Sequence, residues 1–118
     1  MKFFVDTYAL VEIIKGNENY QKYINYELTT SIINLYELFY YLLKSYDEDK
    51  AKEIYYQYTD IVMPIRDEHI FEASKIRLKM KNISYADALG YAISLKEDIK
   101  FLTGDKEFKD SDNVEFVK

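Results

Sequence analysis

The chain has 118 residues, of which 48% are hydrophobic and 31% charged, so its composition predicts one folded domain spanning residues 1–118 and excludes a disordered chain. It contains no cysteine and a single histidine, which excludes disulfides, thiolate metal sites and histidine-rich zinc sites. The first apolar run is too short for a signal peptide or a membrane span, so we expect a cytoplasmic protein with no membrane contact.

Five short apolar or β-branched runs predict strands, at residues 3–5, 29–33, 61–63, 99–102 and 114–117. Apolar residues at helical spacing predict helices between them, at residues 7–15, 18–26, 34–46, 47–58, 67–81 and 84–96. This alternation predicts an α/β fold with a central, mainly parallel sheet of about five strands flanked by helices. In such sheets, functional sites lie beyond the carboxyl ends of the strands, and Asp6 and Asp105 both follow closely after a predicted strand.

Three acidic residues lie in unusually apolar surroundings. Asp6 lies within the segment of residues 3–10, while Glu37 and Asp87 are the only charged residues of segments 32–43 and 83–95. A carboxylate removed from water is costly unless it is paired, hydrogen-bonded or bound to a metal. Because the chain has only two arginines, we expect these acids and Asp105 to hold a hard cation, Mg²⁺ or Mn²⁺, which prefers oxygen ligands.

Each of these acids also has a simpler explanation. Asp6 has the position of a helix N-cap, and Asp105 lies in a segment that resembles a plain turn. Residues 34–37 and 84–87 both have the form of a capping box, with Glu37 and Asp87 at the N3 position. For any one acid alone, capping or a turn is the commoner role. The two roles are compatible, because a helix N-terminus stabilises an ionised carboxylate.

The net charge of −5 argues against a nucleic-acid ligand, because phosphate contacts need lysine and arginine. Setting aside the four acids above leaves 17 acidic residues against 16 basic ones. If those four acids hold a divalent cation, the charge near them is far less negative than the composition suggests. The objection to a nucleic-acid ligand is therefore weakened.

The sequence resembles the PIN-domain nucleases, particularly the compact VapC-type toxins of toxin–antitoxin pairs, over essentially its whole length. Four segments carry the resemblance, in the order and approximate spacing of the family's four acidic motifs: Phe4-Val5-Asp6-Thr7, Asn34-Leu35-Tyr36-Glu37-Leu38, Ser84-Tyr85-Ala86-Asp87-Ala88 and Leu102-Thr103-Gly104-Asp105-Lys106-Glu107-Phe108. The resemblance implies a central parallel sheet, one or two Mg²⁺ or Mn²⁺ ions, hydrolysis of RNA phosphodiesters and an antitoxin protein as partner.

Carried over residue by residue, the resemblance makes Asp6, Glu37, Asp87 and Asp105 the catalytic ligands of the metal, directly or through water. Thr7 and Thr103 match the family's hydroxyl positions. The fourth acid is the family's most variable one, and Asp110 and Asp112 lie close enough in sequence to compete with Asp105 for that role.

Other features have structural interpretations. The tyrosine-rich helix from Asn34 is apolar nearly all round, which predicts burial on more than one side and a homodimer. The 13 tyrosines also suit base stacking, although most are expected in the core or a subunit contact. We expect His69 to be a solvated surface residue and Gly90 to permit close backbone packing.

Two other functions fit the sequence less well. A PIN-like binding or scaffold module would keep the fold without catalysis, but four intact acids count against it. An aspartyl phosphotransferase also places an Asp after its first strand, with a later lysine for which Lys106 is the candidate. That class needs a second Asp soon after the first, and residues 7–10 contain none.

Overall fold

Four parallel strands form the centre of the structure, a computed structural model that describes residues 1–118. Their order across the sheet is β2-β1-β3-β4, and their bounds are Glu27–Thr29, Lys2–Val5, Lys100–Thr103 and Val114–Phe116 in that order. Because β2 and β3 lie on opposite sides of β1, the chain changes its direction of winding at β1. The carboxyl ends of β1 and β3 therefore lie side by side at the place where α/β sheets most often bind ligands.

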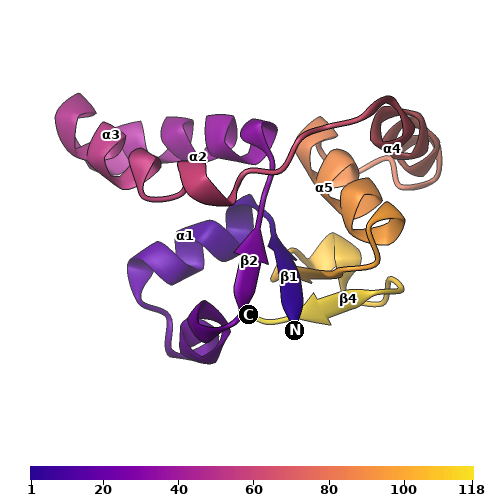
Figure 1. Cartoon of the computed structure of the whole chain (residues 1–118), viewed down its shortest axis with the longest axis horizontal. Helices are drawn as coiled ribbons and strands as arrows, with labels where there is room; N and C mark the ends of the chain where they lie inside the picture. Colours follow the sequence, from indigo (N-terminus) through magenta and orange to yellow (C-terminus); the bar gives the residue numbers. More distant parts are fainter.

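Helices connect the strands and cover both faces of the sheet. The five α-helices are α1 (Thr7–Lys15), α2 (Ile32–Ser45), α3 (Glu48–Tyr56), α4 (Asp67–Lys79) and α5 (Tyr85–Lys96). Three 3₁₀ helices complete the chain: η1 (Glu18–Asn25), η2 (Thr59–Ile61) and η3 (Lys106–Phe108). In Figure 1, α1, α2 and α3 lie on one side of the strands, and α4 and α5 on the other. None of these helices combines the length and the apolar character that a membrane span requires.

Alternation along the strands divides the core into two layers. Phe3, Val5 and Leu102 pack with α1, η1, α2 and α3, whereas Phe4 and Phe101 pack with α4, α5 and η3. Each central strand is thus buried on both faces, which explains why its sequence is a continuous apolar run rather than an alternating one. The expected α/β class and parallel sheet are confirmed.

The sheet has four strands, so the expectation of about five was wrong. Residues 61–63 form only an isolated bridge, in which Val62 pairs with Thr30. The pairing cannot lengthen, because Pro64 has no N–H to donate on one side and Ser31 already caps a helix on the other. The expected strand at 29–33 was also misplaced, since β2 is Glu27–Thr29 and α2 begins at Ile32.

The segment at residues 18–26 is helical as expected, but it is the 3₁₀ helix η1. The expected role of Gly90 in close backbone packing is confirmed. A Cβ atom added there would lie 2.6 Å from Cε1 of Phe4, so α5 approaches β1 more closely than any other residue would allow.

Candidate active site

Asp6 lies at the junction of β1 and α1 and is 1% exposed. Its Oδ1 atom accepts a hydrogen bond from the backbone N–H of Ala9 at 2.8 Å, which makes it the N-cap of α1. Its Oδ2 atom accepts a hydrogen bond from the hydroxyl of Thr103, at the end of β3. The capping role expected from the sequence is therefore real, and it holds the carboxylate at the carboxyl edge of the sheet.

The carboxyl of Asp6 is strongly perturbed. Its pKa is raised from 3.8 to about 8, chiefly by burial; the charges of Asp87 and Asp105 contribute to the rise, and the hydrogen bonds from Thr103 and Ala9 oppose it. No positive charge lies near Asp6 to favour its ionised form, because its polar neighbours are two hydrogen-bond donors and two other acids.

Asp105 follows β3 and is partly buried. Its backbone N–H donates to Oγ1 of Thr103 at 3.0 Å, and its Oδ1 atom accepts from the N–H of Glu107 at 3.0 Å, so it caps η3. Asp110 and Asp112, the alternative fourth acids, are exposed. Only Asp105 among these three raises the pKa of both Asp6 and Asp87.

Glu37 lies in the second turn of α2 and is partly buried. Its Oε1 atom accepts a hydrogen bond of 2.7 Å from the hydroxyl of Thr7, the first residue of α1. The expected capping box at residues 34–37 was wrong, because Ser31 is the N-cap of α2 and Asn34 lies inside the helix. Glu37 is therefore not tied to its own helix end, and its carboxylate turns toward the start of α1.

Asp87 lies in the first turn of α5 and forms the expected capping box with Ser84. The backbone N–H of Asp87 donates to Oγ of Ser84 at 3.0 Å, and the N–H of Ser84 donates to Oδ2 of Asp87 at 3.4 Å. The pKa of Asp87 is raised from 3.8 to about 6, chiefly by burial; the charges of Asp105 and Glu37 contribute to the rise, and the hydrogen bonds with Ser84 oppose it. The pKa of Asp87 is thus affected by one acid on α2 and by another at the start of η3.

The four acids influence one another electrostatically, yet none has a basic partner. Every ion pair of the structure involves other acids, and no lysine, arginine or histidine nitrogen lies within 4.0 Å of these four carboxylates. Their oxygens do not form a group of three within 4.8 Å of one another. The side chains would have to close further to share one ion.

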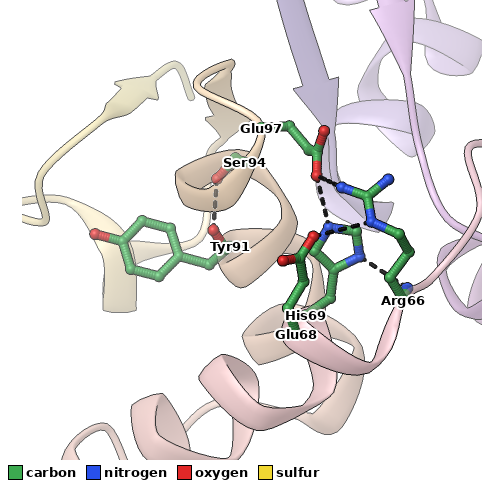
Figure 2. A network of polar contacts seen from close by, with 6 residues as sticks. All are labelled: Arg66, Glu68, His69, Tyr91, Ser94 and Glu97. Atoms are coloured by element: carbon green, nitrogen blue, oxygen red, sulfur yellow. Dashed lines mark hydrogen bonds and ion pairs between the residues drawn. The ribbon is translucent and has the colours of Figure 1, made fainter.

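The one group of three potential ligands at that spacing is Glu68, His69 and Glu97, at the opposite end of α5 from Asp87. Figure 2 shows the side chain of Arg66 within this group, where its guanidinium pairs with both Glu68 and Glu97. Nδ1 of His69 accepts the backbone N–H of Arg66 at 3.0 Å, so Nε2 carries the proton and faces Glu97 at 2.9 Å. A nitrogen that carries a proton is not a metal ligand, so this group is an ion-pair network.

This network corrects the expectation for His69, which is completely buried rather than solvated. Its sequence neighbours Asp67 and Glu68 are polar, which suggested exposure. Its actual partners, Arg66 and Glu97, include a residue 28 positions away that no local pattern indicates. The hydrogen bond from His69 and the charge of Arg66 lower the pKa of Glu97, so this network stabilises its ionised carboxylate.

The comparison with protein families finds one match, to the PIN domain, over residues 3–114. The chain belongs to the PIN-domain family. The resemblance read from the four acidic motifs is confirmed. A comparison with the curated proteins finds no match.

Solved structures share this PIN-like fold along the whole chain. VapBC2 from Rickettsia felis, bound to a DNA fragment from its promoter, has a TM-score of 0.79 at 21% identity and covers 100% of both chains. DNA-bound VapBC from Salmonella typhimurium has a TM-score of 0.78 at 16% identity, covering 99% of this chain and 97% of that one. VapBC-1 from nontypeable Haemophilus influenzae has a TM-score of 0.77 at 17% identity, covering 100% and 98%.

Two apolar hollows open on the surface of this PIN domain. The larger, of about 510 Å³, lies along α4 and α5 and is hereafter the α4–α5 groove; its lining includes Ile33, Ile70, Arg77, Leu78, Tyr85 and Leu89. The smaller, of about 320 Å³, lies between α2 and α3 and is lined by Ile32, Tyr36, Phe39, Lys52, Tyr55 and Tyr56. Ile33, one of the residues that line the α4–α5 groove, lies one helical turn before Glu37 on the same face of α2, so the groove begins beside one of the acids.

Proposed function

We propose that this PIN domain is a metal-dependent endoribonuclease that hydrolyses RNA phosphodiesters and acts as the toxin of a toxin–antitoxin pair. Asp6, Glu37, Asp87 and Asp105 are its metal-binding and catalytic acids. One observation carries the proposal: four acids that influence one another electrostatically lie near the carboxyl ends of β1 and β3, and none of them has a basic partner. A divalent cation bound between these acids would supply the positive charge that the protein itself does not place there.

The donor set fits Mg²⁺ or Mn²⁺. It consists of carboxylate oxygens from four separate elements, with no sulfur and no imidazole, which is the ligand chemistry these hard cations prefer. When bound, the cation would lower the pKa of a water molecule and neutralise charge that develops on the scissile phosphate. Binding requires ionised acids, so the cation would compete with the protons that burial favours on Asp6 and Asp87.

The chain itself orients the acids. The N–H of Ala9 and the hydroxyl of Thr103 each hold one oxygen of Asp6, and this leaves the remaining lone pairs of its carboxylate for a ligand. The hydroxyl of Thr7 holds Oε1 of Glu37, and the capping box holds Oδ2 of Asp87. These three carboxylates are therefore held by donors before any ligand binds, which limits the further movement needed to bring them around one ion.

The decisive experiment measures cleavage of a structured RNA by wild-type protein and by Asp6→Asn, Glu37→Gln and Asp87→Asn, with Mn²⁺ and with chelator. Each substitution keeps the size of the side chain but removes its charge, so we expect cleavage to be lost while thermal melts show an intact fold. Glu53→Gln and Asp60→Asn are matched controls at acids on α3 and η2 that should keep full activity.

Near wild-type, chelator-sensitive cleavage by the three site variants would contradict the assignment of these acids as the catalytic site and leave them with structural roles. Wild-type protein that folds but neither binds Mn²⁺ nor cleaves RNA would favour a PIN-like scaffold without catalysis. Labelling of Asp6 by an acyl phosphate donor would instead reveal a phosphotransferase.

The proposed partner is an antitoxin whose apolar segment occupies the α4–α5 groove. Leu78 and Tyr85 are each 78% exposed in this groove, and an apolar surface of this kind is unusual on a protein that has no partner. Because the groove begins beside Glu37, a basic side chain on the same segment would reach the acids and supply the missing positive charge. Proteins of this fold were solved as toxin–antitoxin complexes from several bacteria, among them Klebsiella pneumoniae.

The chain is also proposed to form a homodimer through the exposed face of α2. Tyr36 is 74% and Tyr40 62% exposed, and Ile32 lies beside them at the hollow between α2 and α3. The helix is thus buried by its own chain on one side only, whereas its sequence is apolar nearly all round. Light scattering at micromolar concentration should give twice the chain mass, and Tyr36→Glu should give the monomer mass; a monomeric wild type would contradict the dimer.

A further inference from the structure

A line of buried and partly buried polar side chains runs from the start of α2 to Glu37. The hydroxyl of Ser31 contacts Oδ1 of Asn34 at 2.7 Å, and Nδ2 of Asn34 contacts the hydroxyl of Thr7 at 3.2 Å. That hydroxyl contacts Oε1 of Glu37 at 2.7 Å. Ser31 and Asn34 are completely buried, and no buried polar side-chain atom of the structure lacks a hydrogen-bond partner.

Simple chemistry determines the direction of these hydrogen bonds. An ionised Glu37 carboxylate only accepts, so the single hydroxyl hydrogen of Thr7 must point to it. Thr7 can then only accept from Asn34, which therefore presents its NH₂ group to Thr7 and its carbonyl oxygen to Ser31. The backbone oxygen of Asn34 is the other possible acceptor for the Thr7 hydroxyl. It lies 3.5 Å from Oγ1, so the hydrogen bond to Glu37 at 2.7 Å is much stronger.

The arrangement matters because Glu37 has no other side-chain or backbone donor. Asp6 and Asp87 are held by backbone N–H groups of their own helix ends, whereas the Glu37 side chain extends from the middle of α2. Three rotatable bonds separate its carboxylate from the helix, so an unrestrained side chain would sample several directions. Thr7 removes that freedom only while its hydroxyl hydrogen points away from Asn34.

We propose that Asn34 is a positioning residue that, through Thr7, orients the Glu37 carboxylate for the divalent cation. The role rests on the proposed function, since it concerns the site in which that cation would bind. Ser31 fixes the amide of Asn34, Asn34 fixes the hydroxyl of Thr7, and Thr7 fixes Glu37. We name this set the Ser31–Asn34–Thr7 relay. It couples the N-terminus of α2 to the N-terminus of α1.

The test measures the dissociation constant for Mn²⁺ by calorimetry, without RNA. Thr7→Val keeps the shape but removes the hydroxyl, and we expect about 10-fold weaker binding, the lower end for loss of a group that orients a metal ligand. Thr7→Ser keeps the hydroxyl and should restore the affinity. Asn34→Leu leaves Thr7 free to donate in either direction, so its loss should be smaller, about threefold.

Thr29→Val is the matched control. Thr29 is a buried threonine whose hydroxyl, like that of partly buried Thr7, donates one hydrogen bond; its acceptor is the backbone oxygen of Ile61 at 2.8 Å, away from the acids. We expect it to lower the melting temperature as much as Thr7→Val does, without changing the Mn²⁺ affinity. A purely structural role for the relay would make the two valine variants behave alike in both measurements.

The double variant tests whether Asn34 acts through Thr7. Once Thr7→Val has removed the hydroxyl, adding Asn34→Leu should weaken Mn²⁺ binding no further, because the relay is already broken. Independent, multiplicative losses would overturn the proposal, as would wild-type affinity in Thr7→Val. Wild-type protein that binds no Mn²⁺ at all would overturn the proposed function and, with it, this role; variants that differ from a binding wild type test the relay alone.

Discussion

The hydroxyl of Thr103 donates a hydrogen bond to Oδ2 of Asp6 while accepting one from the backbone N–H of Asp105 at 3.0 Å. One side chain at the end of β3 thereby connects two acids that lie 99 residues apart in the sequence. Thr7 has a similar pair of hydrogen bonds, since its hydroxyl accepts from the side-chain amide of Asn34 and donates to the carboxylate of Glu37. In both cases an N–H donor occupies the threonine oxygen, so its hydrogen is directed to the acid.

Metal-free protein should lose stability as the pH rises from about 4 to about 8. The pKa of Asp6 is about 8 in the folded state against 3.8 as its ordinary value, and that of Asp87 is about 6, so the folded protein binds more protons across this range. Stability then falls with rising pH. Thermal melts between pH 5.5 and 8 should show this decline, and Asp6→Asn should remove most of it.

The same measurement with Mn²⁺ supplies the control. The cation binds the ionised acids, so it should raise the melting temperature more at pH 8 than at pH 5.5. A wild-type melting temperature that rises between pH 5.5 and 8 without metal would contradict the burial of an uncompensated Asp6 carboxyl.

Asp105, rather than Asp110 or Asp112, should be the fourth acid. Asp105 is partly buried and its charge acts on Asp6 and Asp87, whereas the other two are exposed. Asp105→Asn should weaken Mn²⁺ affinity at least about 10-fold, since the loss of a group that only orients a metal ligand already costs about that much. Asp112→Asn is the matched control and should bind Mn²⁺ like the wild type. The reverse order of the two affinities would assign the role to Asp112.

Local patterns were sufficient to predict most elements of this fold. Strands β1, β3 and β4 and the capping box of α5 depend on residues adjacent in sequence, so their predicted positions agree with the structure to within about two residues. The start of α2 was misplaced because two caps competed. Asn34 has the form of an N-cap, but Ser31 takes that role because its hydroxyl accepts the N–H of Asn34.

The candidate site was less accessible from the sequence, because its contacts are distant. Three of the four acids were recognisable by their apolar neighbours and all four by the family motifs, whereas the hydrogen bond between Thr7 and Glu37 spans 30 positions. The fifth expected strand failed for a similar reason. Residues 61–63 have β-type composition, but the sheet offers them a partner only at Thr30. Composition indicates that a residue can pair, and the topology determines whether it does.

Leu78→Asp should disrupt binding of the proposed antitoxin to the α4–α5 groove. Leu78 is 78% exposed, so the substitution should leave the fold intact while placing a charge in an apolar contact. Phe71→Asp is the matched control, because Phe71 is a 65% exposed apolar residue of the same helix outside the groove. Co-purification with the antitoxin should be lost only for Leu78→Asp. Equal losses for both variants, or for neither, would contradict the groove as the binding surface.

His69→Leu should destabilise the protein by about 1 to 3 kcal/mol, the cost of leaving a buried polar group without its partner. The substitution removes the acceptor for the N–H of Arg66 and the donor to Glu97. Mn²⁺ affinity should be unchanged, because this network lies at the other end of α5 from Asp87. Denaturant unfolding measures the first effect and calorimetry the second. Zn²⁺ or Mn²⁺ that stabilised the wild type but not His69→Leu would show a metal site here.

Gly90→Ala should destabilise the fold although alanine is the better helix former. The gain in helix propensity is about 1 kcal/mol. Against it, the added Cβ would lie 2.6 Å from Cε1 and 3.2 Å from Cζ of Phe4, and 3.2 Å from Cε1 of Phe101. Both rings are completely buried, so neither can move aside into solvent. Overpacking of this kind costs about 1 to 3 kcal/mol or more, so we expect a net loss of about 1 kcal/mol in denaturant unfolding.

Phe4→Leu makes room at the contact, so Gly90→Ala should cost less in that background than in the wild type. Stabilisation by Gly90→Ala in the wild-type background would show that α5 and β1 separate easily at this point.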